Sequence, residues 1–186
     1  GLNREQLYFS ATHTHCSIGG WGEGMAGEAF AGSFNPGART WFASRFVAAA
    51  RDALRDLRPA EFGQGSFRAP EFVRNRVVGK LGKVDDEFSF VIFRQDQGRS
   101  VVLGVYSAHA TVLSGRVMEF SGDYPGAWQR AIEQSTNTVA LFLGGAVGSH
   151  APVAGESGFA GAERMGTALA ARLQQELPQI SFTNSI

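Results

Sequence analysis

The sequence predicts a single layered α/β domain over residues 1–186, with a mixed β-sheet flanked by helices. Apolar, β-rich runs alternate with amphipathic helical segments, which is typical of layered α/β domains. Two of the β-rich runs are separated only by the turn signal "QDQG", so they predict an antiparallel hairpin within a chain that otherwise uses crossover connections. With 44% hydrophobic residues, the chain can bury a full core.

The first third of the chain predicts a strand, a long loop and a helix. The run "EQLYFSATHT" at residues 5–14 indicates a buried strand, and the glycine-rich residues 19–37 indicate a loop. Residues 38–59 predict an amphipathic helix, because apolar side chains recur on one face at helical spacing. That apolar stripe is Phe42, Phe46, Ala49, Ala53 and Leu57.

The rest of the chain continues the alternation without a linker between domains. The predicted elements are a strand and bend at 60–72, the hairpin at 87–109, a short helix at 123–135, a buried strand at 138–145, a long helix at 161–177 and a last strand at 179–185. The long helix carries an apolar stripe made of Met165, Ala168, Leu169, Leu173 and Leu177.

Charge and cysteine content exclude several classes of protein. Seventeen basic residues balance seventeen acidic ones and no basic run stands out, so no broad surface for nucleic acid is expected. The lone Cys16 rules out an intrachain disulfide and a zinc cluster built from several cysteines. No apolar segment reaches the roughly 20 residues that a membrane-spanning helix needs.

The histidines are the candidates for metal ligands or acid–base groups. His13 and His15 lie two residues apart, and in a strand their side chains would project from the same face. Imidazole is both a common metal ligand and the usual acid–base group, although a His-x-His pair also arises by chance. His109 ends another apolar strand, where α/β folds assemble their sites. His150 follows a third strand, and a solvated loop histidine is its favoured interpretation.

Two metalloenzyme families fit poorly. No "DH" pair follows the first histidines, which argues against a metallo-β-lactamase. The chain also lacks the length and the repeated βα units of an amidohydrolase barrel.

Four blocks of sequence together carry a resemblance to a known family. In order they are "ATHTHCSIGGW", "RNRVVGKLGKVDDEFSFVIFR", "YSAHATVLSGRVMEFSGDYPGAW" and "LFLGGAVGSHAP". Between about residue 5 and about residue 155, the chain resembles the N-terminal catalytic domain of neutral ceramidases. The resemblance implies a zinc-dependent amidase that hydrolyses the N-acyl bond of ceramide-like lipids to a fatty acid and a sphingoid base.

The resemblance also assigns roles to matching residues. His13 and His109 fall on two ligands of the family's Zn²⁺. His15 is expected to contact the scissile amide or its oxyanion, and Arg76 to hydrogen-bond to the negative charge that develops there.

Other residues near these blocks have two interpretations each. Gly19 and Gly20 would let the loop backbone pass close to substrate, or simply form a tight turn. Asp123 would orient a group in the site, or cap the helix that starts near Tyr124. Cys16 could coordinate metal, but packing as a small hydrophobe is favoured.

The departures from the family leave an alternative open. The family's other zinc ligands, a glutamate and a tyrosine from later in the chain, have no match, so we expect a fragment whose remainder supplies them. Val77 and Val78 replace the family's Ser-Pro, and Ser149 and Ala151 replace its Asp and Ser. The alternative is a non-catalytic or substrate-altered relative, namely a lipid- or carbohydrate-binding module or a different metal-dependent amidohydrolase.

By the same resemblance, the protein is expected to be exported: secreted, periplasmic or at the cell surface. Its expected partner is an N-acyl lipid, with peripheral membrane contact.

Overall fold

The computed structural model describes residues 3–184 and divides into two compact units. Within the described residues, one unit combines residues 3–16 with 60–184, and the other comprises residues 17–59. None of the helices in residues 3–184 combines the length and the hydropathy needed to cross a bilayer.

The smaller unit contains two helices. The expected loop at residues 19–37 is wrong in its middle, because α1 spans Gly24–Ala31. The expected long helix is confirmed as α2, Pro36–Arg55. It begins there because the Asn35 side chain accepts hydrogen bonds from the backbone N–H groups that follow, and because Pro36 suits the first helical position.

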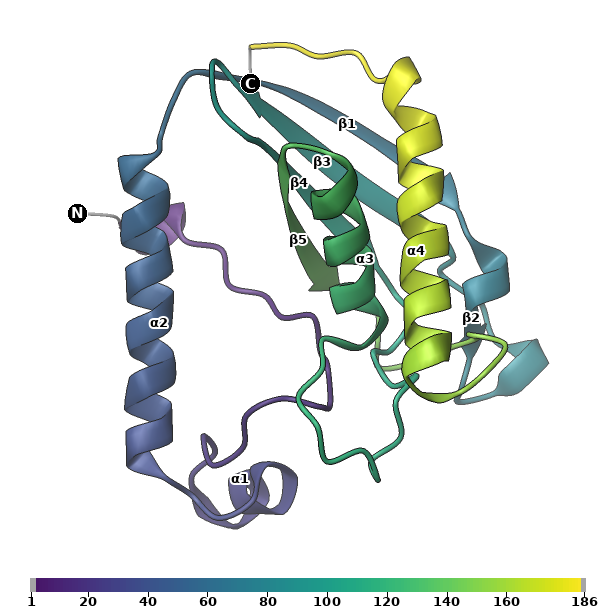
Figure 1. Ribbon diagram of the computed structural model, residues 1–186. Helices are drawn as coiled ribbons and strands as arrows, with labels where there is room; N and C mark the ends of the chain where they lie inside the picture. Colours follow the sequence, from purple (N-terminus) through teal and green to yellow (C-terminus); the bar gives the residue numbers. More distant parts are fainter. Residues whose placement is uncertain (1–2, 185–186) are drawn as a thin grey trace. The chain divides into compact units, whose positions relative to one another are not determined.

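The larger unit is built on a four-stranded mixed sheet in the order β1-β3-β4-β5 (Figure 1). Its strands are β1 Ala60–Arg68, β3 Glu87–Gln95, β4 Ser100–Tyr106 and β5 Thr138–Gly144. Neighbours β1–β3 and β3–β4 are antiparallel, whereas β4 and β5 are parallel. The predicted hairpin and the mixed α/β sheet are therefore confirmed.

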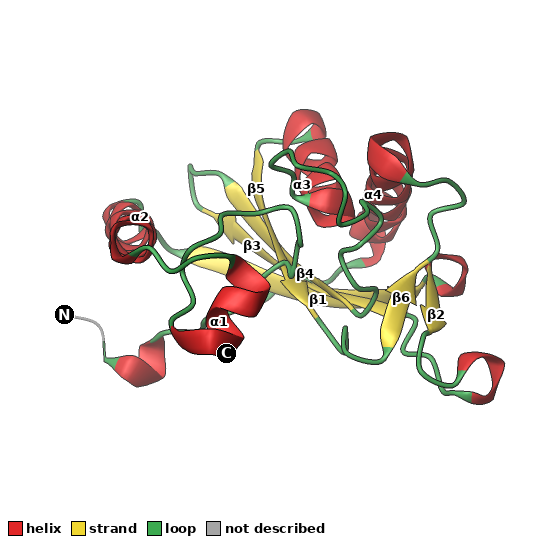
Figure 2. Cartoon of the chain, turned by 90° about the horizontal axis from the view of Figure 1, so that it is seen from below, coloured by secondary structure: helices red, strands yellow, loops and turns green. Residues whose placement is uncertain are grey.

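Two helices lie side by side on one face of this sheet, α3 Asp123–Ser135 and α4 Gly158–Glu176 (Figures 1 and 2). Along β3 the alternate residues Phe88, Phe90 and Ile92 are buried, as the two-residue period of a strand requires. The Phe88 ring lies 5.4 Å from the ring of Trp128 on α3, measured between centroids. The core of the unit thus fills the space between the sheet and the helix pair.

Short elements complete the fold. Strands β2, Val73–Asn75, and β6, His150–Pro152, form a separate antiparallel pair. The single-turn 3-10 helices are η1 Arg4–Gln6, η2 Pro70–Phe72, η3 Gly79–Leu81 and η4 Leu177–Gln179.

Two expected strands are absent from the described residues. Residues 5–14 form no strand: residues 5 and 6 belong to η1, the chain is irregular after them, and Tyr8 and Phe9 are 82% and 73% exposed. Near the other end, within residues 179–184, a single isolated bridge joins Thr183 to Phe62. Apolar, β-branched composition indicated strands in both places, but neither segment has a continuous hydrogen-bonding partner.

The close approach of α3 and α4 predicts a large effect for a small substitution. A Cβ atom added at Gly166 would lie 2.6 Å from the Ala127 side chain and from the backbone of Tyr124 and Trp128. Since backbone cannot move aside cheaply, we expect Gly166→Ala to lower the free energy of unfolding by about 1–3 kcal/mol in urea titrations.

Gly126 in α3 provides the matched control. A Cβ atom there would meet only the Arg130 side chain at 3.5 Å. Gly126→Ala should therefore be neutral, or stabilising by up to about 1 kcal/mol through helix propensity. Equal stabilities for the two variants would contradict the close contact.

Candidate metal centre

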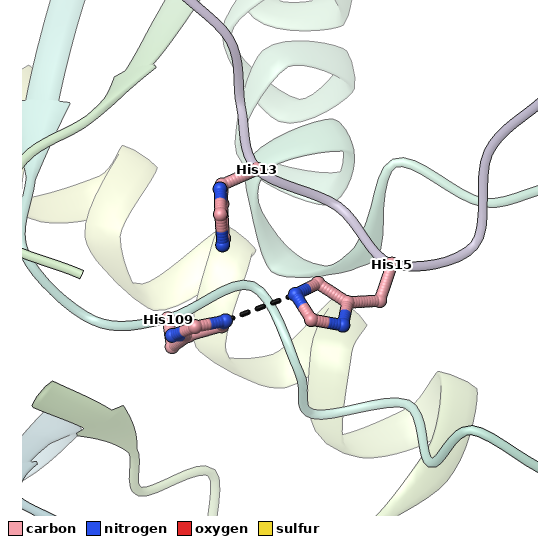
Figure 3. Close-up of side chains that lie close together, drawn as sticks. All are labelled: His13, His15 and His109. Atoms are coloured by element: carbon pink, nitrogen blue, oxygen red, sulfur yellow. Dashed lines mark hydrogen bonds between the residues drawn. The ribbon is translucent and has the colours of Figure 1, made fainter. Parts of the chain in front are cut away.

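Three histidines converge in the larger unit: His13, His15 and His109 (Figure 3). One ligand nitrogen from each ring lies within 4.8 Å of the others. The ring centroids are 4.5 Å apart for His13 and His109, 4.9 Å for His15 and His109, and 5.2 Å for His13 and His15. We refer to these residues as the histidine cluster. It has the donor atoms and spacing of a metal-binding site.

His109 is the anchored member of the cluster. It follows the end of β4 by three residues, in a buried loop, and is itself only 4% exposed. Its Nδ1 lies 2.8 Å from the carbonyl oxygen of Val147. Because that oxygen can only accept, Nδ1 carries the proton and Nε2 presents a lone pair. This Nε2 lies 2.9 Å from Nε2 of His15, the contact drawn in Figure 3.

The segment that carries His13 and His15 is held by single hydrogen bonds rather than by strand pairing. Gly144 N–H donates to Ala11 O at 2.8 Å, and Thr14 Oγ1 donates to Ser121 O at 2.7 Å. His13 has a left-handed backbone, with φ of 61°. The two rings therefore meet because the chain turns between them, and the expected explanation, two side chains on one face of a strand, is wrong.

The cluster disfavours protonation. His13 and His15 are exposed and only His109 is buried, but partial desolvation still lowers the pKa of all three imidazoles below the ordinary value of 6.5, and charge repulsion within the cluster lowers each of them further. For His109 the hydrogen bond to Val147 acts in the opposite direction. Near neutral pH the rings are thus uncharged, which is the state that binds metal.

These pKa shifts predict how the stability of the metal-free protein depends on pH. A histidine whose pKa is lower in the folded state binds fewer protons there than in the unfolded chain, so stability increases with pH. The contribution is complete above about 6.5 and is lost as the pH falls from there through the folded pKa values. We expect a smaller free energy of unfolding at about pH 5.5 than at pH 7.5.

Urea titrations at the two pH values measure this difference. The matched control replaces His13, His15 and His109 together by alanine, and it should lose most of the pH dependence in this window. A triple variant with the same pH dependence as the wild type would show that other groups are responsible.

Arg76 lies close enough to act on the whole cluster. It follows the last residue of β2, where its N–H donates to Ser149 O at 2.9 Å and its Nε donates to Gly148 O at 3.0 Å. Its positive charge lowers the pKa of each histidine in the cluster. Among the described residues, the terminal nitrogens of the guanidinium have no hydrogen-bond partner, so they are available to a ligand.

The remaining candidate residues lie in other settings. Asp123 is 2% exposed, and its carboxylate accepts hydrogen bonds from the backbone N–H groups of Val112, Leu113 and Tyr124. Burial raises the pKa of this carboxyl. Gly19 and Gly20 belong to the smaller unit, where Gly20 N–H donates to a backbone carbonyl in the same unit. Substrate-binding roles for these three residues stay predictions.

Two further residues are now placed. Cys16 is 8% exposed and packs in the hydrophobic core, as favoured from the sequence. His150 is 5% exposed, so the expectation of a solvated loop histidine is wrong. Its Nε2 accepts from Asp85 N–H at 2.9 Å, and its Nδ1 lies 2.8 Å from Ala146 O. It is not a member of the histidine cluster.

Sequence reasoning missed the role of backbone carbonyls in the loop between β5 and β6. Val147 O orients His109 and Gly148 O orients Arg76. The only signal for this loop was the glycine-rich run "GGAVGSHAP" after a buried strand.

Comparison with known proteins shows the fold of the chain. No protein-family model matches the sequence, and no curated protein matches it. Among solved structures, a ceramidase described as complexed with C2 matches 91% of this chain with a TM-score of 0.80 at 19% identity. The neutral ceramidase from Pseudomonas aeruginosa matches 91% with a TM-score of 0.79 at 20% identity.

The match covers only part of each ceramidase. This chain spans 30% of the length of the first and 31% of the second. The chain therefore has a ceramidase-like fold, which corresponds to about a third of a ceramidase chain.

Proposed function

We propose that the histidine cluster is part of the active site of a zinc-dependent amidase that cleaves the N-acyl bond of ceramide-like lipids. The observation that carries this proposal is the convergence of three imidazoles within 4.8 Å, near the Arg76 guanidinium, on a ceramidase-like fold. His13 and His109 are the proposed metal ligands, while His15 and Arg76 are the proposed catalytic groups.

The donor atoms present fit Zn²⁺. Imidazole nitrogen is a preferred ligand of zinc, and a ligating histidine usually donates its other ring N–H to a carbonyl or carboxylate. His109 does so through Val147 O, which leaves Nε2 directed at the cluster. Two histidines are fewer than the three or four protein ligands of a zinc site, so the rest of the protein would supply the others.

Zinc held there would polarise the amide carbonyl and lower the pKa of a water molecule toward neutrality. His15 is uncharged near neutral pH, and its Nε2 lies 2.9 Å from Nε2 of His109. With the His109 lone pair on zinc, the Nε2–H of His15 would be able to donate a hydrogen bond to a carbonyl oxygen that gains charge. The Arg76 guanidinium is permanently charged and stabilises the same oxygen. Both groups bind the transition state more strongly than the substrate.

The substrate and location follow from the same proposal. An N-acyl lipid is the proposed substrate, and it would be reached by peripheral contact with a membrane or micelle. Export from the cytosol is proposed with it, on the basis of the resemblance to neutral ceramidases.

Release of fatty acid by the full-length protein tests the proposal. We expect a short-chain fluorescent ceramide to be cleaved, the activity to disappear on treatment with a chelator, and stoichiometric Zn²⁺ to restore it. A full-length protein that binds zinc but cleaves no N-acyl lipid would instead support a binding module or an amidohydrolase with another substrate.

A further inference from the structure

The loop of residues 145–149 holds both His109 and Arg76 through adjacent carbonyl groups. Val147 O accepts from His109 Nδ1 at 2.8 Å, and Gly148 O accepts from Arg76 Nε at 3.0 Å. A shift of this short loop would move a proposed metal ligand and a proposed oxyanion donor at once. Whatever fixes the loop therefore fixes the geometry of the cluster.

A closed ring of hydrogen bonds anchors the loop at Ala146. Ala146 N–H donates to Ser107 Oγ at 3.0 Å, and Ser107 Oγ donates to the carboxylate of Asp85. Asp85 N–H donates to His150 Nε2 at 2.9 Å, and His150 Nδ1 lies 2.8 Å from Ala146 O. Both polar groups of the Ala146 peptide backbone are thus held by buried side chains.

The bonding pattern defines the tautomer of His150. Because Asp85 N–H can only donate, Nε2 of His150 accepts, and Nδ1 carries the proton that is donated to Ala146 O. Neither nitrogen is left for a metal or a substrate. The imidazole of His150 instead joins the segment before β3 to the loop that follows β5.

We propose that His150 is a positioning residue: through Ala146 it holds the 145–149 loop so that Val147 and Gly148 orient His109 and Arg76. The effect of His150 on turnover rests on the proposed function, but its effect on the geometry of the cluster does not. An experiment that measures the geometry therefore tests the positioning role even if the amidase activity is absent.

Three variants of the full-length protein test the role. His150→Ala removes the two hydrogen bonds of the ring and also the 3.0 Å contact of Nδ1 with Ser149 Oγ. His150→Asn keeps an N–H donor near the position of Nδ1 and can still reach Ala146 O. Ser107→Ala breaks the ring on its other side, in case the His150 variants fold poorly. The stability control is Met165→Ala, which leaves a cavity in the core at a side chain that is 0% exposed and takes no part in the ring.

Two readouts need no substrate. The first is zinc affinity, measured by competition with a chelator. We expect it to fall about 10–100-fold in His150→Ala, as is usual when the partner network around a ligand is lost, and to recover in His150→Asn. The second is the NMR signal of the His109 Nδ1 proton in the metal-free protein, which should be slow to exchange in the wild type and lost in His150→Ala.

The outcomes separate positioning from general destabilisation. Support requires that His150→Ala and Ser107→Ala lose affinity and the proton signal, that His150→Asn regains them, and that Met165→Ala keeps both despite lower stability. Wild-type affinity and signal in His150→Ala would overturn the proposal, as would equal losses in Met165→Ala. If the protein cleaves no N-acyl lipid, the amidase proposal fails while these readouts still decide the role of His150.

Discussion

We expect replacement of His109 by alanine or asparagine in the full-length protein to remove bound zinc and, with it, the proposed hydrolysis of N-acyl lipids. Each substitution deletes the Nε2 lone pair that faces the cluster. The expected fall in zinc affinity exceeds the roughly 10–100-fold cost of losing a partner around a ligand, because here the ligand itself is lost. Zinc content after dialysis and fatty acid release together measure the result.

The asparagine variant separates the loss of the ligand from the loss of structure better than the alanine variant does. Its side-chain N–H can still donate to Val147 O, so the buried loop keeps its hydrogen bond while the ligand is absent. Circular dichroism should show a folded protein. His13→Ala should lose zinc in the same way, whereas His15→Ala should keep zinc and turn over slowly. Full zinc content in His109→Asn would remove His109 from the ligand set.

Arg76→Ala is expected to keep zinc but to lower kcat by roughly a hundredfold or more, the usual effect of losing an oxyanion donor. The side chain is exposed and its Nε bonds a single carbonyl, so the fold should survive. Since Arg76 lowers the pKa of all three histidines, the variant should also raise these pKa values in the metal-free protein. NMR titration measures that change without any substrate.

Two controls accompany Arg76→Ala. Arg76→Lys retains the charge and the pKa effect but loses the planar fork of donors, so it should recover the pKa values and only part of kcat. Arg74→Ala removes a nearby exposed arginine from β2 and should behave like the wild type. Wild-type turnover in Arg76→Ala would exclude this arginine from the mechanism.

Periodicity in the sequence predicted the parts of the fold that are stabilised by local pattern and burial. Alternation along β3 and the stripe of Met165, Leu169 and Leu173 on α4 correspond to one buried face each, so the hairpin and α4 were predictable. The segment at residues 5–14 was not, because an apolar run becomes a strand only where another strand offers hydrogen bonds along its length. Here only isolated groups such as Gly144 N–H do so.

The residues of the candidate site also divide into those that the sequence could predict and those that it could not. His109 could be placed because it follows a buried strand, where α/β folds gather functional groups. The loop carbonyls that orient His109 and Arg76 could not be predicted, since their loop is hydrogen-bonded at Ala146 to the distant Ser107, which in turn donates to Asp85. His150 looked like a loop residue because its partners lie 4 and 65 residues away along the chain.

Anomalous diffraction at the zinc edge, from crystals of the full-length protein, tests the central claim most directly. The account predicts one zinc peak with nitrogen atoms of His13 and His109 about 2.1 Å away. The Nδ1 of His109 would still face Val147 O. A zinc peak elsewhere in the molecule, or protein prepared with zinc that shows no peak between these two rings, would contradict the account.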